Sequence, residues 1–374
     1  MAGQPVRVTL VGPLPGEGWI SIQRYTEAIA SLSGRNGFSV VSAPTLEDAH
    51  YSRAGAYWAR YRRLPRLLER MHPDGRLIHI ADQALGHLVP HFPGHPTVVT
   101  CHDLMPLTMP GHYEGRFEGW VDRFLLRRSL AGMTRATRII AVSAFTATKV
   151  QEVLGVSRHR VSVVPNMLND AYSPQANADD WLREAGIRLP PAPRVLSVGH
   201  TRPYKDIERL LRAMGAPNLR DATLVRVGAP LTRAQRQLAA QQELEGRLVE
   251  LGQLDPPVLS RVYAACQVLA QPSRSEGFGV PVAEAMACGL PVVCSDGGAL
   301  PEVAGGAATI VPAANADDPG VDELAEAIER VLHDAATASM LRERGLARAE
   351  AFRPSAIFPL LLAAYERAIE EHRP

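Results

Sequence analysis

The sequence predicts an α/β protein made of two Rossmann-like, doubly wound domains that face a central cleft. Its 374 residues exceed what one ordinary hydrophobic core accommodates and suit two domains. Short apolar runs alternate with helix-forming segments in both halves, which is typical of parallel sheets covered by helices. A Pro-rich stretch separates the two series. In sheets of this kind, ligands bind beyond the carboxyl ends of the strands.

The strands expected in the first series are apolar runs of four to six residues, with a helix at Ser21–Leu32 after the first: Val6–Val11, Phe38–Ala43, Leu77–Ala81, Thr97–Thr100, Arg138–Val142 and Val161–Val164. We assign residues 1–172 to an N-terminal domain and residues 173–193 to a linker that ends in Pro190-Pro191-Ala192-Pro193. A final helix at residues 356–374 is expected to pack back on the N-terminal domain.

The second series restarts the pattern at residues 194–355, and its expected strands are similar apolar runs: Arg194–Val198, Thr223–Val227, Leu248–Leu251, Val268–Ala270, Pro291–Cys294 and Ala308–Val311. Helices are expected between them and after them, at Asp206–Met214, Asp255–Ala265, Val280–Cys288, Val321–Asp334 and Thr337–Arg348.

Composition excludes several classes of protein. Hydrophobic residues make up 46% and charged residues 21% of the chain, no apolar run is long enough to span a bilayer, and the N-terminus lacks the features of a signal peptide. The four cysteines form no CxxC pair, so we expect reduced thiols in the cytoplasm. Residues 1–190 carry an excess of five positive charges and the remainder an excess of four negative charges, which favours an anionic partner for the first half. The alternative is ordinary surface scatter; we expect no nucleic-acid partner.

The sharpest motif runs from Ser273 to Val293 and reads as strand end, tight turn, helix and strand. Gly277 and Gly279 allow the backbone to turn and to approach a ligand closely. The N–H groups at the start of the following helix, near Val280, form an anion site. Glu276 and Glu284 are expected to face the same cleft, where two carboxylates can accept hydrogen bonds from sugar hydroxyls.

This segment resembles the E-x7-E signature of retaining glycosyltransferases with the GT-B fold, in particular glycosyltransferase family 4. The resemblance implies that Glu276 holds hydroxyls of the donor sugar and that Glu284 holds the ribose of the nucleotide. It also implies that Gly277, Phe278 and Gly279 give backbone contacts to the diphosphate and the sugar. A chance glutamate pair in a βα unit is the alternative, but the EGFG turn and the Pro-x-x-Glu-Ala-Met-Ala-Cys-Gly continuation weigh against it.

A second segment opens the second domain with a strand that ends at Gly199 and a loop that contains Arg202 and Lys205. It resembles the family loop that brings two cations to the donor diphosphate. Lys205 matches the family lysine, and Arg202 is the expected partner. A departing nucleoside diphosphate carries new negative charge, which two cations can stabilise. The alternative is a solvated turn with surface charges.

In the first domain, His102 and Asp103 follow a buried strand and resemble the family's His-Asp element, which places the histidine beside the reacting sugar. These two residues are adjacent and point in different directions, and no suitably spaced third ligand is evident, so we expect no metal. The alternative is a capping aspartate beside a satisfied histidine. Gly16, Glu17 and Gly18 correspond to the family's glycine loop, which faces acceptor and donor phosphate.

A basic segment at residues 53–71 combines six arginines with apolar residues at helical spacing. A basic amphipathic helix can lie on an anionic membrane, and Pro65 favours two short helices over one. The alternative is a helix that buries its apolar stripe against the first sheet.

The resemblance implies transfer of a hexose from a GDP- or UDP-linked sugar to a hydroxyl, with retention and without metal or other cofactor; mannose and GDP are preferred. The N-terminal domain would bind the acceptor and the C-terminal domain the donor. We expect a polyprenyl-diphosphate-linked saccharide as acceptor, in surface polysaccharide synthesis at the inner face of the cytoplasmic membrane. The alternatives are glycosylation of a small soluble molecule or natural product, a GT-B epimerase that hydrolyses UDP-sugars, and a non-catalytic sugar-nucleotide binding protein.

Overall fold

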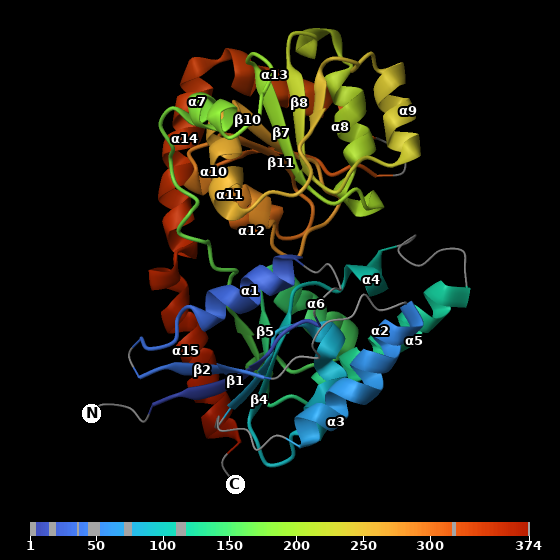
Figure 1. The fold of residues 1–374 in the computed structure, drawn as a ribbon, viewed down its shortest axis with the longest axis vertical. Helices are drawn as coiled ribbons and strands as arrows, with labels where there is room; N and C mark the ends of the chain where they lie inside the picture. The colour runs from blue at the N-terminus through green and yellow to red at the C-terminus, as the bar shows by residue number, and fades with distance from the viewer. Residues whose placement is uncertain are drawn as a thin grey trace. The chain divides into compact units, whose positions relative to one another are not determined.

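The computed structural model describes residues 5–14, 20–35, 37–43, 53–70, 77–109, 117–315 and 319–372 (Figure 1). The chain divides into two compact units: unit 1 comprises Met1–Met167 with Pro354–Pro374, and unit 2 comprises Leu168–Arg353. Each unit is built on one six-stranded sheet, and all described strand pairs are parallel, as the alternating pattern predicts.

Unit 1 has the strand order β2-β1-β3-β4-β5-β6. Its strands are β1 (Arg7–Val11), β2 (Ser39–Ser42), β3 (Leu77–Ile80), β4 (Thr97–Cys101), β5 (Arg138–Ala141) and β6 (Val161–Val163). Its helical elements are α1 (Ile20–Ala30), α2 (Arg53–Trp58), η1 (Ala59–Arg63), α3 (Leu64–Glu69), η2 (Gln83–His91), α4 (Met105–Thr108), α5 (Phe117–Met133), α6 (Ala144–Leu154), η3 (Arg158–Arg160) and α15 (Pro354–Glu371).

Successive strand residues of this sheet enter two different hydrophobic cores, because side chains alternate between the faces of a strand. Val98 packs in a cluster with residues of α1 and α15, whereas Val99 packs with residues of α3, η2, α5 and α6. The helix α6 shows how local sequence sets the element ends. The Ser143 hydroxyl accepts a hydrogen bond from Thr146 N at 3.0 Å, and Gly155 ends the helix at a φ of 65°.

The basic segment at residues 53–71 is helical through α2, η1 and α3, with η1 a π-helix. Pro65 stands at the start of α3, where its missing N–H matters least, and the wide π turn precedes it. The prediction of two short helices is therefore wrong in detail. Ala59, Leu64 and Leu68 are buried in the unit 1 core, so the apolar stripe faces the protein.

The C-terminal helix α15 is an integral part of unit 1. Ile357, Phe358, Leu361 and Tyr365 are buried in the core cluster on the α1 face of the sheet. The helix contacts β3, β4 and β5. The end of the chain thus covers one face of the first sheet.

Unit 2 has the strand order β12-β11-β10-β7-β8-β9, with helices lying around the sheet (Figure 1). Its strands are β7 (Arg194–Gly199), β8 (Thr223–Gly228), β9 (Leu248–Glu250), β10 (Val268–Gln271), β11 (Val292–Ser295) and β12 (Thr309–Val311). Its helical elements are α7 (Ala178–Glu184), η4 (Pro203–Lys205), α8 (Ile207–Met214), η5 (Pro217–Leu219), α9 (Arg233–Gln241), α10 (Pro256–Ala265), α11 (Val280–Ala287), α12 (Leu300–Ala304), α13 (Val321–His333), α14 (Ala335–Ala349) and η6 (Glu350–Phe352).

Residues 173–193, expected to link the domains, lie within unit 2. The helix α7 packs on α10, with Leu182 buried and Trp181 under the guanidinium of Arg261. Arg194 in β7 pairs with Asp179 at 2.6 Å. These contacts hold the Pro-rich segment on unit 2, whereas its composition alone predicts a linker.

Strand order locates the point in each sheet where ligands are expected. In unit 2 the chain runs outward from β7 through β8 to β9, then returns to place β10 on the other side of β7. The switch point therefore lies between β7 and β10, and the loops that leave these two strands flank it. The same logic places the switch point of unit 1 between β1 and β3.

Candidate active site

Glu276 lies in the loop after β10 and accepts three hydrogen bonds on a single oxygen. The donors to its Oε1 are Lys205 Nζ at 2.6 Å, Ser273 Oγ at 2.7 Å and Gln271 Nε2 at 2.8 Å. The Glu276 side chain is 8% exposed and that of Lys205 11%. Its other oxygen, Oε2, accepts no hydrogen bond from a described residue, which leaves this atom for a ligand hydroxyl.

The pair joins the two loops that flank the unit 2 switch point, since Lys205 follows β7 and Glu276 follows β10. Two further contacts tie these loops together. Arg274 N donates to Tyr204 O at 2.7 Å, and the Arg274 guanidinium lies 3.3 Å from the buried carboxylate of Asp206. The structure thus brings Lys205 and Glu276 together within a rigid frame.

Backbone geometry explains the glycines around Glu276. Gly279 has a φ of 96° at the start of α11, and a Cβ there would lie 2.6 Å from Leu300. The loop after β11 presses on the Glu276 backbone, where Ala299 N donates to Glu276 O at 2.9 Å. A Cβ on Gly298 would lie 2.4 Å from Glu276 O, so only glycine allows this approach. The sequence analysis missed this support, although Gly297-Gly298 after an apolar strand is a visible signal.

Phe278 and Gly277 were expected to contact the donor through their backbone. The Phe278 ring is buried and meets Phe352 edge-on, with 5.3 Å between ring centroids. This contact fixes the turn from the inside. The Phe278 side chain is therefore an anchor within the protein, and a contact of this turn with a donor stays a prediction for its backbone.

Glu284 lies in α11 and is held by a tyrosine that the sequence analysis did not identify. Tyr263 in α10 donates its hydroxyl to Glu284 Oε2 at 2.8 Å, and both side chains are buried. Burial, followed by the Glu284 charge, raises the pKa of Tyr263 well above its ordinary value, so the phenol stays protonated and donates. No sequence motif identifies this tyrosine as a site residue, because the sequence of α10 predicts only an ordinary amphipathic helix.

The loop after β7 gathers positive charge. Burial, then Arg202, Lys205 and Arg226, lower the pKa of His200, so the imidazole is neutral beside three cations. Arg202 itself is exposed at the start of η4. The structure therefore places Arg202 and Lys205 on one short loop, as the spacing predicts.

Arg226, in β8, is a buried cation that the sequence analysis missed. Its guanidinium donates to Ser197 Oγ at 2.8 Å and to Gly199 O at 3.2 Å, which steadies the end of β7. Burial lowers its pKa to about 10, so it remains charged. A single arginine inside an apolar strand was the available signal.

His102 lies in unit 1 directly after β4. Its Nε2 is 2.8 Å from Ala81 O, and because a carbonyl only accepts, Nε2 carries the proton and Nδ1 keeps a lone pair. The ring meets Tyr25 edge-on at 4.9 Å. Burial lowers the pKa of His102 despite the opposing effect of Asp82, so the imidazole is neutral. Ala81 follows β3, which puts His102 beside the unit 1 switch point.

Asp103 takes a structural role in the described geometry. Its Oδ1 accepts a hydrogen bond from Met105 N at 3.1 Å at the start of α4. Its backbone carbonyl accepts one from Gln83 Nε2, while Gln83 Oε1 accepts one from His102 N. The expected loop residues Gly16, Glu17 and Gly18 lie outside the described residues.

A buried hydrogen-bond chain runs behind His102. Tyr365 OH lies 2.8 Å from His79 Nδ1, His79 Nε2 lies 2.8 Å from Thr100 Oγ1, and Thr100 lies 2.9 Å from Tyr25 OH. Burial lowers the pKa of His79 to about 3, so the chain is uncharged. It connects α15 to the tyrosine that contacts His102.

No group of three or more His, Cys, Asp or Glu side chains among the described residues is placed to hold a metal ion. No helix in the same part of the chain has the length and apolarity that a bilayer crossing requires.

Family models match both units. Residues 183–348 match "Glycosyl transferases group 1", and residues 2–172 match "Glycosyltransferase Family 4". The chain belongs to glycosyltransferase family 4. This finding confirms the family that the E-x7-E segment indicates, and the protein is accordingly a glycosyltransferase with the GT-B fold.

Three curated relatives match different shares of the chain. The O-antigen chain mannosyltransferase B of Escherichia coli is 28% identical over 91% of this chain and 93% of its own. The D-inositol 3-phosphate glycosyltransferase of Mycobacterium sp. (strain JLS) is 31% identical over 64% of this chain and 54% of its own. The MMP alpha-(1->4)-mannosyltransferase of Mycolicibacterium hassiacum is 28% identical over 74% of this chain and 66% of its own.

Two solved structures match the fold over almost the whole chain. Sucrose-phosphate synthase from Thermosynechococcus elongatus has a TM-score of 0.76 at 22% identity and covers 98% of this chain and 99% of its own. Anabaena Alr3699/HepE in complex with UDP-glucose has a TM-score of 0.74 at 19% identity and covers 96% of this chain and 98% of its own.

Proposed function

We propose that this glycosyltransferase moves a hexose, mannose by preference, from a nucleotide-diphosphate sugar to a hydroxyl acceptor, with retention and without a metal. The observation that carries the proposal is the Lys205–Glu276 pair at the switch point of unit 2. The buried carboxylate of Glu276 accepts its hydrogen bonds from described residues on Oε1 alone, so Oε2 can accept one from a polyhydroxylated ligand. A lysine beside it suits the phosphate that leaves that ligand.

In the proposed reaction, the bond between the anomeric carbon and the diphosphate oxygen breaks, and a bond from that carbon to the acceptor oxygen forms on the same face. The acceptor proton passes to the leaving phosphate, so the step balances without a protein nucleophile. Lys205 and Arg202 stabilise the charge on the departing diphosphate, which removes the need for a metal. Glu276 holds the donor sugar and Glu284 the ribose.

His102 contributes as a neutral group. Because its Nε2–H donates a hydrogen bond to Ala81 O, its Nδ1 can accept a hydrogen bond from a sugar hydroxyl. It cannot act as an acid while it is neutral. Its proposed task is to orient the donor sugar.

For the acceptor we propose a polyprenyl-diphosphate-linked saccharide, used in surface polysaccharide synthesis by a protein bound peripherally to the cytoplasmic face of the membrane. The likeness to an O-antigen chain mannosyltransferase over 93% of that protein supports this choice. A small phosphorylated acceptor is the second candidate, and the likeness to a D-inositol 3-phosphate glycosyltransferase favours it. GDP-mannose is the preferred donor and a UDP-sugar the alternative.

The donor site is tested by thermal shift with GDP, UDP, ADP, TDP and CDP on the wild type, Glu284→Ala and the matched control Glu343→Ala. Glu343 is exposed in α14, away from the contacts described above. We expect one nucleotide to stabilise the wild type and the control and to lose its effect in Glu284→Ala. The absence of stabilisation by every nucleotide would contradict the donor assignment.

The reaction itself is tested with the nucleotide sugar identified in that panel. We expect a product with the donor's anomeric configuration by NMR, and unchanged turnover after chelation of divalent metals. Inverted product, or activity lost on chelation, would overturn the corresponding part of the proposal. Nucleotide binding without transfer to any acceptor would favour a non-catalytic binding protein.

A further inference from the structure

A strained backbone position lies beside Lys205. Asp206 has a φ of 51°, in the left-handed region that favours glycine. Among the described residues other than glycine, Asn177 and Glu243 share this conformation, and both are exposed. Asp206 is only 3% exposed. A buried residue keeps such a conformation where the surrounding contacts hold it, and such positions gather at functional sites.

The Asp206 carboxylate does not cap the helix that it precedes. Asp206 stands directly before α8, where an aspartate side chain ordinarily accepts a hydrogen bond from the first helical turn. In the described structure its side chain makes no such bond. Its backbone carbonyl accepts one from Leu210 N at 3.4 Å. Capping of α8 by the side chain therefore does not explain why an aspartate occupies this position.

The Asp206 carboxylate instead reaches the loop that carries Glu276. Its Oδ2 lies 3.3 Å from Arg274 Nε, and its Oδ1 lies 3.4 Å from Arg274 Nη2. An arginine that meets both oxygens of one carboxylate in this way forms a forked ion pair. The Asp206 side chain is buried and that of Arg274 is 48% exposed. Arg274 thus compensates a carboxylate charge whose burial without a partner is costly.

The backbone of Arg274 is held in place on its own loop. Arg274 N donates to Tyr204 O at 2.7 Å. A Cβ on Gly297 would lie 2.4 Å from Ser273 O and 2.7 Å from Arg274 O, so the loop after β11 passes directly against this backbone. The Arg274 guanidinium therefore extends from a fixed main chain toward Asp206.

Two ion pairs consequently join the loops that flank the unit 2 switch point. The loop after β7 contributes Lys205 and Asp206, and the loop after β10 contributes Arg274 and Glu276. Each loop carries one cation and one anion, and each cation pairs with the anion of the other loop. The two pairs share no residue, so one can persist when the other is weakened.

We propose that Asp206 is a positioning residue of the donor site, whose ion pair with Arg274 keeps the two loops in register while Lys205 binds the donor diphosphate. The proposal rests on the proposed function, because it takes Lys205 as a ligand of the diphosphate. A lysine that turns its charge toward phosphate gives up part of its pairing with Glu276. The Asp206–Arg274 pair then holds Glu276 in place, and the strained backbone is retained because it aims the carboxylate at Arg274.

The first test is Asp206→Gly, with Glu243→Gly as the matched control. Both changes relieve a left-handed residue, at φ values of 51° and 54°, and both remove one carboxylate. Glu243→Gly should raise the melting temperature by about 3 °C or less and leave the donor KM and turnover unchanged. Asp206→Gly should keep the melting temperature at or above that of the wild type, yet lower kcat/KM for the donor by about tenfold to a hundredfold, the cost of a displaced binding group.

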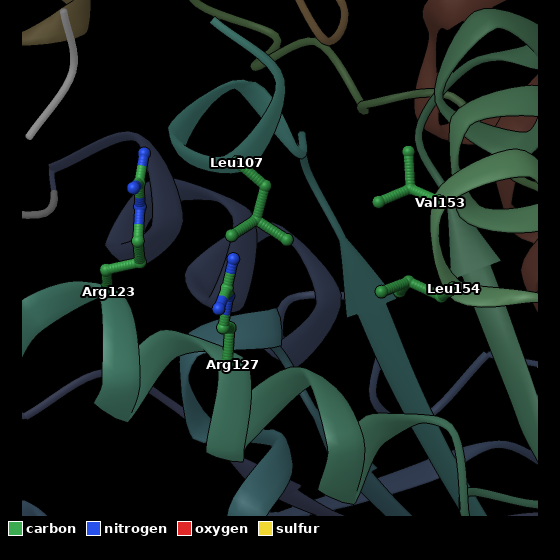
Figure 2. Close-up of a pocket in the computed structure, with 5 residues that line it drawn as sticks. All are labelled: Leu107, Arg123, Arg127, Val153 and Leu154. Carbon is green, nitrogen blue, oxygen red and sulfur yellow. The ribbon is translucent and has the colours of Figure 1, made fainter. Parts of the chain in front are cut away.

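The second test, Arg274→Gln, removes the exposed partner and leaves the left-handed residue in place. Its control is Arg127→Gln in unit 1, where Arg127 is exposed and extends toward Leu107 in a pocket between α4, α5 and α6 (Figure 2). We expect Arg274→Gln to reproduce the kinetic loss of Asp206→Gly, whereas Arg127→Gln keeps the donor KM. Asp206→Gly combined with Arg274→Gln should be no worse than the worse single variant, because the two side chains act as a unit.

Hydrogen exchange of the Arg274 amide separates this proposal from the proposed function. This amide donates to Tyr204 O, so its exchange rate reports whether the two loops stay joined. Lys205→Ala imitates a lysine withdrawn from Glu276. In that background Asp206→Gly should accelerate the exchange more than it does in the otherwise unchanged protein, since no ion pair then joins the loops.

Two outcomes overturn the proposal: a donor KM and turnover that stay unchanged in Asp206→Gly and Arg274→Gln, or an Arg274 amide that exchanges equally fast with and without Asp206. Failure of the proposed function looks different. The Asp206 variants would still exchange faster, although no nucleotide stabilised the wild type.

Discussion

Both sheets have six parallel strands and one switch point, yet the groups beside the two switch points are held in opposite ways. In unit 2, Lys205 and Glu276 form a buried ion pair, and two neutral donors share the same carboxylate oxygen. In unit 1, His102 is neutral and is held by a carbonyl and a tyrosine ring. The comparison indicates that unit 2 holds an ion pair, Lys205 with Glu276, at its switch point. Unit 1 holds a neutral imidazole, that of His102, in a fixed orientation.

The largest effect expected from this comparison is the loss of charge stabilisation in unit 2. Lys205→Ala should reduce turnover by roughly 10²–10³, the cost of losing one preorganised donor to transition-state charge. The variant also leaves Glu276 with only its neutral donors. Steady-state kinetics with saturating donor measures the effect.

The matched control is Lys149→Ala, which removes the protein's other lysine from the surface of unit 1, where it pairs with Glu152. We expect turnover near that of the wild type. Equal activity of Lys205→Ala and Lys149→Ala would show that the diphosphate assignment is wrong and would remove the contrast between the units.

The next largest effect is the loss of stability of unit 1 at acidic pH. Burial lowers the pKa of His79 to about 3 and that of His87 to about 4, whereas both take up a proton near pH 6.5 when unfolded. Unfolding therefore binds protons below pH 6.5, so stability is complete above that value and falls as the pH drops toward 3. One such group contributes a slope of about 1.4 kcal/mol per pH unit.

Denaturant unfolding between pH 7 and pH 4.5 measures this slope, with His79→Gln compared with His159→Gln. His159 is exposed and contacts Ser157, so its replacement should leave the slope unchanged. His79→Gln should flatten the slope by about one proton while lowering stability at neutral pH, because the buried chain loses a member. An unchanged slope in His79→Gln would contradict a neutral chain in unit 1.

These particulars also separate what the sequence predicts from what it cannot. The two sheets and the family were predictable, because apolar runs and the E-x7-E segment are local patterns. The pairing of Lys205 with Glu276 follows once strand order is known, since the motifs end adjacent strands. Tyr263, Arg226 and Gly298 were not predicted, because their roles come from contacts across 20 to 30 positions that no local pattern encodes.

The smallest expected effect concerns the tyrosine that holds Glu284. Tyr263→Phe removes one hydrogen bond and leaves Glu284 in place, so the donor KM should rise about tenfold, the lower end of the roughly 1.5 to 3 kcal/mol that a hydrogen bond to a charged group contributes. Turnover at saturating donor should change little, because a ribose bound by Glu284, as proposed, would be held equally in the ground and transition states. Tyr172→Phe is a close comparison, since its ring meets Tyr263 edge-on with 6.0 Å between centroids. A fall in kcat without a change in KM would move Glu284 from donor binding to the chemical step, and Glu284 would then join the cations of unit 2 that act on the reaction.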